Sequence, residues 1–336
     1  MGGSYVGPPF FCVIPGSIRL HAALRGVAMV NLQEPIAADH GVETDEMGYE
    51  LTSSSLINVD YIAPPAAISD YVTTLYHFWC DETVIRDVQP SSVGHLALFP
   101  RGTGEMHFRE GHSDPNHRVA ILTPLSNATP IVVDGPFHVI GAALTPLGWA
   151  CLTQLHAGEH RDRLRKASEI LGDDVDELGE ALIASYLDGS KSGKECALAI
   201  GEYIGRKVKP INSRHADLVR VVNGWLGSSM NPDLADLLEV AAYSERQVQR
   251  LTERYFGLSP QALARKYRAL RAAAYLSFPQ LTPEFEAELG DAFFDQSHMI
   301  REINRFVGRT PARLKDPDNP FLSEMIAPKN LRELDG

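Results

Sequence analysis

The chain has 336 residues, 44% of them hydrophobic and 22% charged, and its formal net charge at pH 7 is −12. A chain of this length predicts two domains, each with its own core, and the hydrophobic content is ordinary for a globular protein. The excess of acidic residues excludes nucleic-acid binding over the whole surface, because nucleic acids are polyanions.

The four cysteines, Cys12, Cys80, Cys151 and Cys196, are widely spaced and form no CxxC pair. This spacing indicates neither a disulfide framework nor a zinc site. The first 30 residues lack a basic segment followed by an apolar run and a cleavage site, and no stretch is long enough to span a membrane. We therefore expect a soluble, cytoplasmic protein without a membrane partner.

Short β-branched and apolar runs follow one another in the first half of the chain. Gly, Pro, Ser and Asn turns separate these runs, which is typical of a sandwich or barrel. The residues before Tyr71 carry few periodic signals, and the sequence assigns no role to residues 1–70. The predicted strands are Tyr71–Cys80, His95–Phe99, Met106–Arg109, Arg118–Leu122, Pro130–Val133 and Phe137–Leu144.

From Thr145 onward the apolar residues take helical spacing, so helices are expected to follow the β region. The sequence then divides into a first domain, residues 1–208, a linker, residues 209–213, a second domain, residues 214–320, and a tail, residues 321–336. The predicted helices that trail the β region are Leu147–His156, Asp173–Leu187 and Lys194–Val208.

Two segments of the second domain, Ser244 to Pro260 and Asp295 to Pro311, repeat one design at an offset of 51 positions. Each begins with an N-cap residue, whose side-chain oxygen can accept a hydrogen bond from a free amide of the first helical turn. Each ends with a glycine, Gly257 or Gly308, which suits the left-handed position that terminates a helix. The chain therefore carries two copies of one capped helix.

Each capped helix follows a shorter helical segment and a tight connection. Leu234, Leu237, Leu238 and Ala241 have the three-and-four spacing of a helix, and Thr282-Pro283 opens the matching segment of the second copy. Two short helices joined by a turn describe a helix-turn-helix, whose second helix can enter the major groove of DNA. Charge agrees with this interpretation: residues 241–315 hold 12 Lys and Arg against 8 Asp and Glu, whereas residues 1–213 hold 15 against 26.

The outward faces of the two capped helices carry side chains that can read DNA. Arginine pairs bidentately with guanine and glutamine with adenine, and an apolar group can touch a thymine methyl. The alternative for any single helix is a charged face that is only solvated, but the repeat favours recognition. The candidate residues are Arg246, Gln249 and Arg250 in the first copy and Gln296, Ser297, Ile300, Arg301 and Arg305 in the second.

These residues resemble a known family. Both modules, and the long helix expected from Pro260 to about Phe278, are similar to the DNA-binding domain of the AraC/XylS family of transcriptional regulators. The resemblance covers the last third of the chain and rests on SERQVQRL at 244–251, YFGLSP at 255–260 and FDQSH at 294–298. It implies an all-α domain of seven helices, with two recognition helices in successive major grooves. It also implies that the first seven candidates above read bases, while Arg305 and Arg309 reach phosphates.

The sequence departs from the family pattern in both turns. A glycine is usual there, but this chain has Ala242 and Ala292, and a left-handed alanine costs about 1 kcal/mol. Two usual phenylalanines of the second recognition helix are replaced by Met299 and Ile303, which keep the site apolar. A usual basic residue is Asn304, which removes one phosphate partner.

The first domain resembles, without equally sharp motifs, the cupin-like sensor half of many regulators of this family. The resemblance implies an effector-sensing and dimerisation domain in which a small molecule occupies the barrel. Trp79 and Trp149 are the candidates for a ligand-stacking wall, and two core aromatics are the alternative. The expected fold class is α+β, with a mostly β barrel or sandwich and its trailing helices followed by an all-α domain.

A metal-binding β domain is the main alternative. His95, His107, His112 and His117, with nearby carboxylates, are residue types that cupin metal sites use, but they lack the HxH spacing that puts two imidazoles on one face of a strand. We therefore expect exposed loop histidines, no metal and no cofactor. No nucleophile with its base and no phosphate-binding loop is evident, which predicts no catalytic residues and no enzyme. The alternative function is a cupin-like metal-binding enzyme or sensor with the helical half as an appendage.

The sequence as a whole predicts a sequence-specific DNA-binding transcriptional regulator, controlled by a small-molecule effector or a partner through its first domain. Its expected partners are double-stranded DNA and RNA polymerase. The sequence identifies neither the effector nor the operator, and it does not decide between activation and repression or whether homodimers form.

Overall fold

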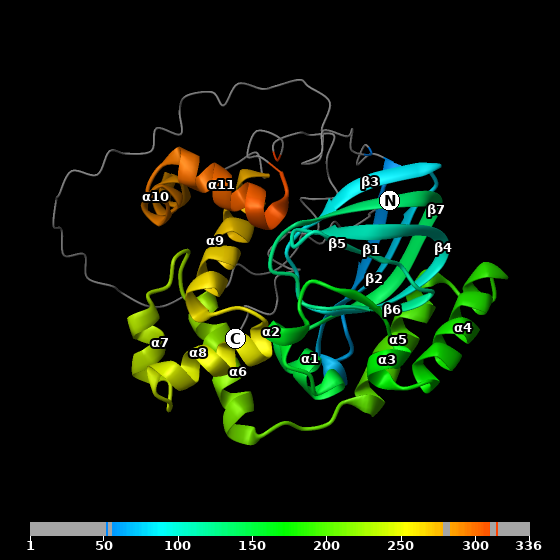
Figure 1. The fold of residues 1–336 in the computed structure, drawn as a ribbon, viewed down its shortest axis with the longest axis horizontal. Coiled ribbons are helices and arrows are strands. Elements are labelled where there is room, and N and C mark those ends of the chain that lie inside the picture. Colours follow the sequence, from blue (N-terminus) through cyan, green and yellow to red (C-terminus); the bar gives the residue numbers. More distant parts are fainter. Residues whose placement is uncertain (1–51, 53–55, 278–282, 310–313, 315–336) are drawn as a thin grey trace, which may run out of the picture.

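The computed structural model describes residues 52, 56–277, 283–309 and 314, and of residues 283–287 it describes the backbone alone. The expected helix start at Thr310-Pro311, the tail and Cys12 lie outside the described residues. Residues 56–208 form a β unit with attached helices, and residues 213–277 and 283–309 form a helical unit beside it (Figure 1).

The β unit contains eight strands and six helices. The strands are β1 (Asn58–Ile62), β2 (Val72–Cys80), β3 (Val84–Gln89), β4 (His95–Phe108), β5 (His112–Pro115), β6 (Val119–Leu122), β7 (Thr129–Leu144) and β8 (Leu164–Lys166). The helices are η2 (Ala66–Ile68), α1 (Pro146–Thr153), α2 (Ala157–His160), α3 (Ser168–Leu171), α4 (Asp174–Leu187) and α5 (Gly193–Lys207).

All eight strands belong to one antiparallel sheet in the order β1-β2-β7-β4-β6-β8, with β3 beside β7 and β5 beside β4. The two longest strands, β4 and β7, pair along most of their length. The first half of β7 pairs with β3 and its second half with β2. The long strand β7 therefore connects the part of the sheet that contains β3 with the part that contains β2.

Two predictions about the strands were wrong. His95–Phe99 and the first three residues of Met106–Arg109 are parts of the single strand β4, which ends at Phe108, and Pro130–Val133 and Phe137–Leu144 are parts of β7. The glycines between them do not form turns. Gly102 and Gly135 lie where the register between β4 and β7 shifts, and Gly104 pairs with Val133 within the ladder. Strands β1, β3, β5 and β8 are additional to the predicted ones.

Side chains alternate between the two faces of the sheet. On one face, Leu75, Ile121 and Ile140 are buried beneath α4 and α5, which pack on β4 and on β2 and β7. On the other face, side chains such as Phe78 and Phe137 surround an inner cavity. The predicted trailing helices are confirmed as α1, α4 and α5, and residues 208–212 after them have no regular secondary structure.

The helical unit has six helices within its described residues. The longest, α9, lies between α8 and α11 (Figure 1), and its buried Leu263, Tyr267 and Leu270 share a core with the inward stripes of both neighbours. Cys151 and Leu147 of α1 join the same core, so the two units are packed together. The six helices are α6 (Ser213–Gly227), α7 (Leu234–Val240), α8 (Glu245–Phe256), α9 (Pro260–Leu276), α10 (Pro283–Ala292) and α11 (Gln296–Val307).

The end of α11 depends on the absence of a side chain at Gly308. This residue has a φ of +81°, and a β-carbon there would collide with Val88 of β3. We expect Gly308→Ala to lower the free energy of unfolding by about 2–5 kcal/mol, because a left-handed alanine and overpacking both cost energy. Unfolding in urea measures the loss.

Gly257→Ala is the matched control for this substitution. Gly257 ends α8 with a similar φ of +83°, but the nearest atom to its β-carbon would be 3.6 Å away. Only the backbone cost of about 1–2 kcal/mol should therefore appear. Equal losses in the two variants would show that α11 does not meet β3 in solution.

Candidate nucleic-acid interface and inner cavity

The two capped helices form as the sequence predicts. At the start of α8, Ser244 and Gln247 make a capping box, and at the start of α11 Asp295 Oδ1 accepts a hydrogen bond of 2.6 Å from the amide of His298. Gly257 and Gly308 end the helices in the left-handed conformation. Local capping therefore fixes the length of each helix.

The alanines in the two turns do not introduce the strain that a left-handed backbone would cause. Gln154 and Asp162 are the non-glycine residues with a positive φ in the described part of the chain, and Ala242 and Ala292 are not among them. At the first turn, Ala241 adopts an extended conformation instead, with φ −74° and ψ 128°. The turns have therefore adjusted to the missing glycines.

On α8 the predicted reading residues share one exposed face. Arg246, Gln249 and Arg250 are all exposed, while Val248 and Leu251 on the opposite face are buried in the core. This arrangement leaves two guanidinium groups and one amide available to a ligand in solution.

On α11 the predicted residues are less uniform. Ser297, Arg301 and Arg305 are exposed, whereas Gln296 and Ile300 are half-buried. Met299, Ile303 and Phe306 are buried in the core. The helix therefore presents Ser297 and Arg301 fully and Gln296 and Ile300 in part.

The β unit holds the C-terminal end of α11. Asn127 Oδ1 accepts a hydrogen bond of 2.8 Å from Arg305 Nε, and the amide of Ala128 donates to the carbonyl of Arg305 at 2.9 Å. The amide of Ser91 donates to the carbonyl of Phe306 at 2.7 Å. These bonds occupy carbonyls that a helix end otherwise leaves without partners.

Arg309 completes this contact from inside the protein. Its guanidinium lies 2.7 Å from Asp87 Oδ1 of β3, and the two side chains are only 2% and 4% exposed. Burial raises the pKa of Asp87, and the charge of Arg309 opposes that rise. The prediction that Arg309 reaches a DNA phosphate was wrong for this arrangement, because a local pattern does not show that a distant strand covers the residue.

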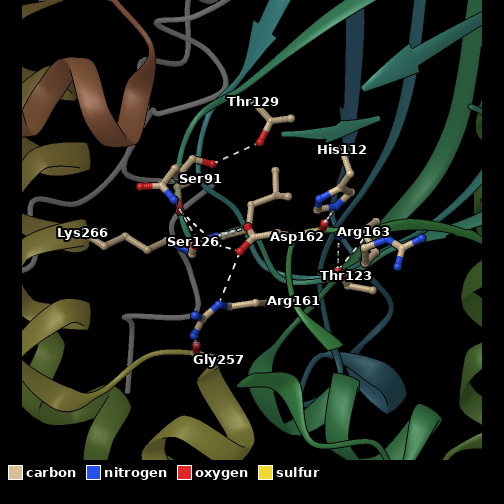
Figure 2. Close-up of polar contacts among 12 residues, drawn as sticks. Ser91, His112, Thr123, Ser126, Thr129, Arg161, Asp162, Arg163, Gly257 and Lys266 are labelled. Atoms are coloured by element: carbon tan, nitrogen blue, oxygen red, sulfur yellow. Dashed lines mark hydrogen bonds and ion pairs between the residues drawn. The ribbon is translucent and has the colours of Figure 1, made fainter. Parts of the chain in front are cut away.

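The β unit also contacts α8 and α9, as Figure 2 shows. Arg161 donates a hydrogen bond of 3.1 Å to the carbonyl of Gly257, where α8 ends. Lys266 of α9 donates to the carbonyl of Ser92, which the figure does not label, at 3.0 Å. Asp162 fixes the loop that carries Arg161 by accepting two hydrogen bonds of 2.7 Å from Ser126. We call all these contacts between the β unit and the helical unit the interdomain contact. They include the ion pair of Asp87 with Arg309 and the hydrogen bond from Arg161 to Gly257.

A second buried ion pair organises the helical unit itself. Arg268 of α9 approaches Glu302 Oε2 of α11 at 2.7 Å and 3.0 Å, and both side chains are 9% exposed. The same guanidinium donates to Asn231 and to the carbonyl of Ala292, and it lies 4.9 Å from the ring centroid of Phe293. Sequence reasoning missed this pair, although both residues stand among apolar inward positions, which is the signal that could have identified it.

The inner face of the sheet encloses a cavity of about 210 Å³. Most of its lining is apolar and aromatic, and His95 of β4 also faces it. The segment from Asp87 to Ser92 forms part of its wall, and Leu270 of α9 closes it from the helical unit. The cavity thus borders directly on the interdomain contact.

The two tryptophans proposed as a ligand wall do not line this cavity. Trp149 is 1% exposed in the core beneath the helices, and Trp79 stacks on His77 with ring centroids 4.6 Å apart. The structure therefore places both residues away from the inner space, on the side of the sheet that the helices cover or at its margin.

The expectation of exposed loop histidines was wrong. His95 and His107 lie on β4 and His112 on β5, and these three residues and His117 are all half-buried. His112 Nε2 lies 3.0 Å from the carbonyl oxygen of Asp162. Among the described residues, no three His, Cys, Asp or Glu side chains lie close enough to hold a metal ion. None of the described helices is long and apolar enough to cross a membrane.

Comparison with known proteins identifies a family match within the helical unit. Residues 237–316 match the family model described as a helix-turn-helix domain, and this segment contains α8, α9, α10 and α11. The match confirms the helix-turn-helix domain that the sequence predicts. No curated protein matches the chain.

Similar solved structures include ToxT from Vibrio cholerae O395, which is 9% identical and has a TM-score of 0.41 over 77% of this chain and 96% of that one. Wild-type ToxT from Vibrio cholerae strain SCE256 with a bound unsaturated fatty acid is 10% identical, with a TM-score of 0.40 over 69% and 94%. The AraC-like transcriptional activator CuxR is 11% identical, with a TM-score of 0.27 over 65% and 87%. The similarity to these structures is distant, so we infer the function from this chain's own residues.

The Arg268–Glu302 pair yields a stability prediction. We expect Arg268→Ala to lower the free energy of unfolding by about 3–5 kcal/mol, because it leaves Glu302 buried without its partner charge. Arg220→Ala on α6 is the control, since Arg220 and Asp217 form an exposed pair worth about 0–1 kcal/mol. Chemical denaturation compares the two, and similar small losses would contradict the role of Arg268.

His95 yields a prediction about pH. Burial, and to a smaller extent the nearby Lys266, lowers the pKa of His95 to about 4. The unfolded chain binds a proton near pH 6.5, so the stabilisation is complete above that pH and is lost as the pH falls toward 4. Between pH 7 and 4.5 the wild type should lose about 2–3 kcal/mol more than His95→Gln. Urea unfolding at both pH values measures this, and parallel losses would contradict it.

Proposed function

We propose that this protein is a transcriptional regulator that binds specific sites in double-stranded DNA through α8 and α11, and that a small molecule bound in its β unit controls this binding. One observation carries the proposal: two capped helices of the same design flank α9 inside a helix-turn-helix domain, and both expose arginines at matching positions. Helices of this kind enter successive major grooves, about 34 Å apart along the duplex.

The exposed side chains supply the chemistry that base recognition needs. Arg246, Arg250 and Arg301 can each donate two hydrogen bonds to guanine, and Gln249 can pair with adenine. The half-buried Ile300 is suited to contact a thymine methyl. Because residues 241–315 are net basic in an acidic chain, the helical unit is the part that a polyanion would approach.

The interdomain contact supports control by the β unit. It holds the C-terminal ends of α8 and α11 but leaves Arg246, Gln249, Arg250 and Arg301 exposed. Control would therefore act on the placement and phosphate contacts of the helices and not by covering their reading faces. As a regulator, the bound protein would recruit or obstruct RNA polymerase.

The base contacts can be tested by substitution. Arg250→Ala and Arg301→Ala should each weaken binding to a site selected from a random DNA pool by about 1–3 kcal/mol, with the fold unchanged. Arg220→Ala, an exposed arginine of α6, is the control and should bind as the wild type does. Fluorescence anisotropy at fixed salt measures the affinities. Equal affinity of all four proteins, or selection of no preferred site, would refute the proposal.

Arg305 allows a separate test of the contact with the β unit. Asn127→Ala removes its hydrogen-bond partner, so Arg305 becomes available to a phosphate and DNA affinity should rise by about 0.5–1.5 kcal/mol. The slope of log K against log salt should steepen by about 0.9, the value for one more phosphate contact. In an Arg305→Ala background the substitution of Asn127 should have no effect. A gain that persists there would show that Arg305 is not responsible.

A further inference from the structure

One end of the inner cavity carries three polar atoms that have no hydrogen-bond partner among the described residues. These are Thr73 Oγ1, Ser92 Oγ and His95 Nε2, and all three residues line the cavity. Thr73 and His95 lie at the same end, because Thr74, Ala143 and His95 are neighbours across β2, β7 and β4, and Thr73 sits in the bulge beside Thr74. Ser92 lines the cavity three positions before His95 in the chain. We call these three residues the polar end.

Most of the remaining lining is apolar, although Asp87, Glu105 and Asn116 also belong to it. Phe78 and Phe99 lie further along β2 and β4 than the polar end, and each ring centroid is 5.8 Å from that of Phe137. Buried polar groups without partners cost free energy, whereas an aromatic wall gains from contact with an apolar ligand. A ligand that satisfies both would be apolar over most of its length and polar at one end.

Charge further restricts the ligand. The described lining residues include the carboxylates of Asp87 and Glu105 but no lysine or arginine. Asp87 is already paired with Arg309, and His95 is neutral near pH 7 because burial lowers its pKa to about 4. Lys266 lies outside the lining and donates to the carbonyls of Ser92 and Leu125. A buried anion would therefore have no charged partner within the lining.

We infer that the cavity binds an uncharged, mostly apolar molecule that places one hydrogen-bonding group, such as a hydroxyl, against Thr73, Ser92 and His95. An apolar cavity of about 150 Å³ holds benzene, so the volume of about 210 Å³ suits a molecule of roughly ten non-hydrogen atoms. A two-ring aromatic alcohol meets these conditions of size and polarity.

A ligand bound at the polar end can affect the DNA-binding helices through the residues next to it, and this step rests on the proposed function. Ser92 belongs to the segment whose neighbour Ser91 donates to the carbonyl of Phe306 in α11. The carbonyl of Ser92 accepts the hydrogen bond from Lys266 of α9. A ligand that bonds to the Ser92 hydroxyl therefore restrains the segment that holds α11, and its binding changes the affinity for DNA.

Calorimetric titration of the full chain with three probes of one ring system tests the ligand class. We expect 2-naphthol to bind, naphthalene to bind more weakly because it lacks the hydroxyl, and 2-naphthoate to bind about tenfold or more weakly than 2-naphthol because its charge would be buried. Thr73→Val and Ser92→Ala should each weaken 2-naphthol by about three- to tenfold and leave naphthalene unchanged. Trp79→Phe, outside the cavity, is the control and should bind 2-naphthol as the wild type does.

The ligand class is overturned if 2-naphthol does not bind, if 2-naphthoate binds more tightly than 2-naphthol, or if Thr73→Val and Ser92→Ala bind 2-naphthol as tightly as the wild type does. Circular dichroism and the melting temperature show whether each variant folds. DNA affinity of the ligand-free protein is measured separately, so its absence refutes the proposed function without bearing on the cavity. If 2-naphthol binds, it should shift the DNA affinity of the wild type by about threefold or more, and an unchanged affinity overturns the coupling.

Discussion

A buried ion pair between Asp87 and Arg309 fixes the position of the helical unit against the β unit. They are 222 positions apart in sequence and less than 5% exposed. Separating them without water would leave each charge unpaired, which costs several kcal/mol, so β3 and the end of α11 have to move together or expose both groups to solvent. The close approach of Gly308 to Val88 and the bond from Ser91 to Phe306 follow from this placement.

The same constraint, the cost of separating two buried charges, applies within the helical unit to the pair of Arg268 and Glu302. Arg268 lies two residues after Lys266 on α9, and the two side chains serve different partners. Lys266 contacts the β unit at Ser92, while Arg268 positions α11 and the turn before it. The long helix therefore connects the cavity wall with the second recognition helix through two cationic side chains. Such a chain of contacts transmits a change only if its elements have two arrangements that a ligand can distinguish.

Local signals were sufficient to predict the two capped helices, α8 and α11, but not the contacts around them. Ser244, Asp295, Gly257 and Gly308 act within one or two turns of their own helix, so the sequence alone predicts where α8 and α11 begin and end. The environment of Arg309 depends on a strand more than two hundred residues earlier, and nothing near it in sequence shows that it is buried.

The β unit was harder to predict for the same reason. Strand β3 carries Arg86 and Asp87 in its middle, a polar pair that favours a loop until Arg309 is known to neutralise Asp87. Glycines in β4 and β7 have the appearance of turns, although the paired strand absorbs them. His95 belongs to the cavity because neighbouring strands place it there, whereas the larger Trp79 and Trp149, the candidates for a ligand-stacking wall, lie elsewhere.

Some candidate DNA-contacting residues are bound by the β unit and others are exposed, and this difference matters for the proposed regulation. Contacts to bases specify a site, whereas contacts to phosphates position the protein and act on all sequences alike. The β unit binds Arg305 and Arg309, the residues suited to phosphates, and leaves Arg246, Gln249, Arg250 and Arg301 exposed. A ligand that loosens or tightens this hold would therefore change the affinity for every site by a similar factor. The order of preference among sites would stay the same, because the residues proposed to set it are exposed.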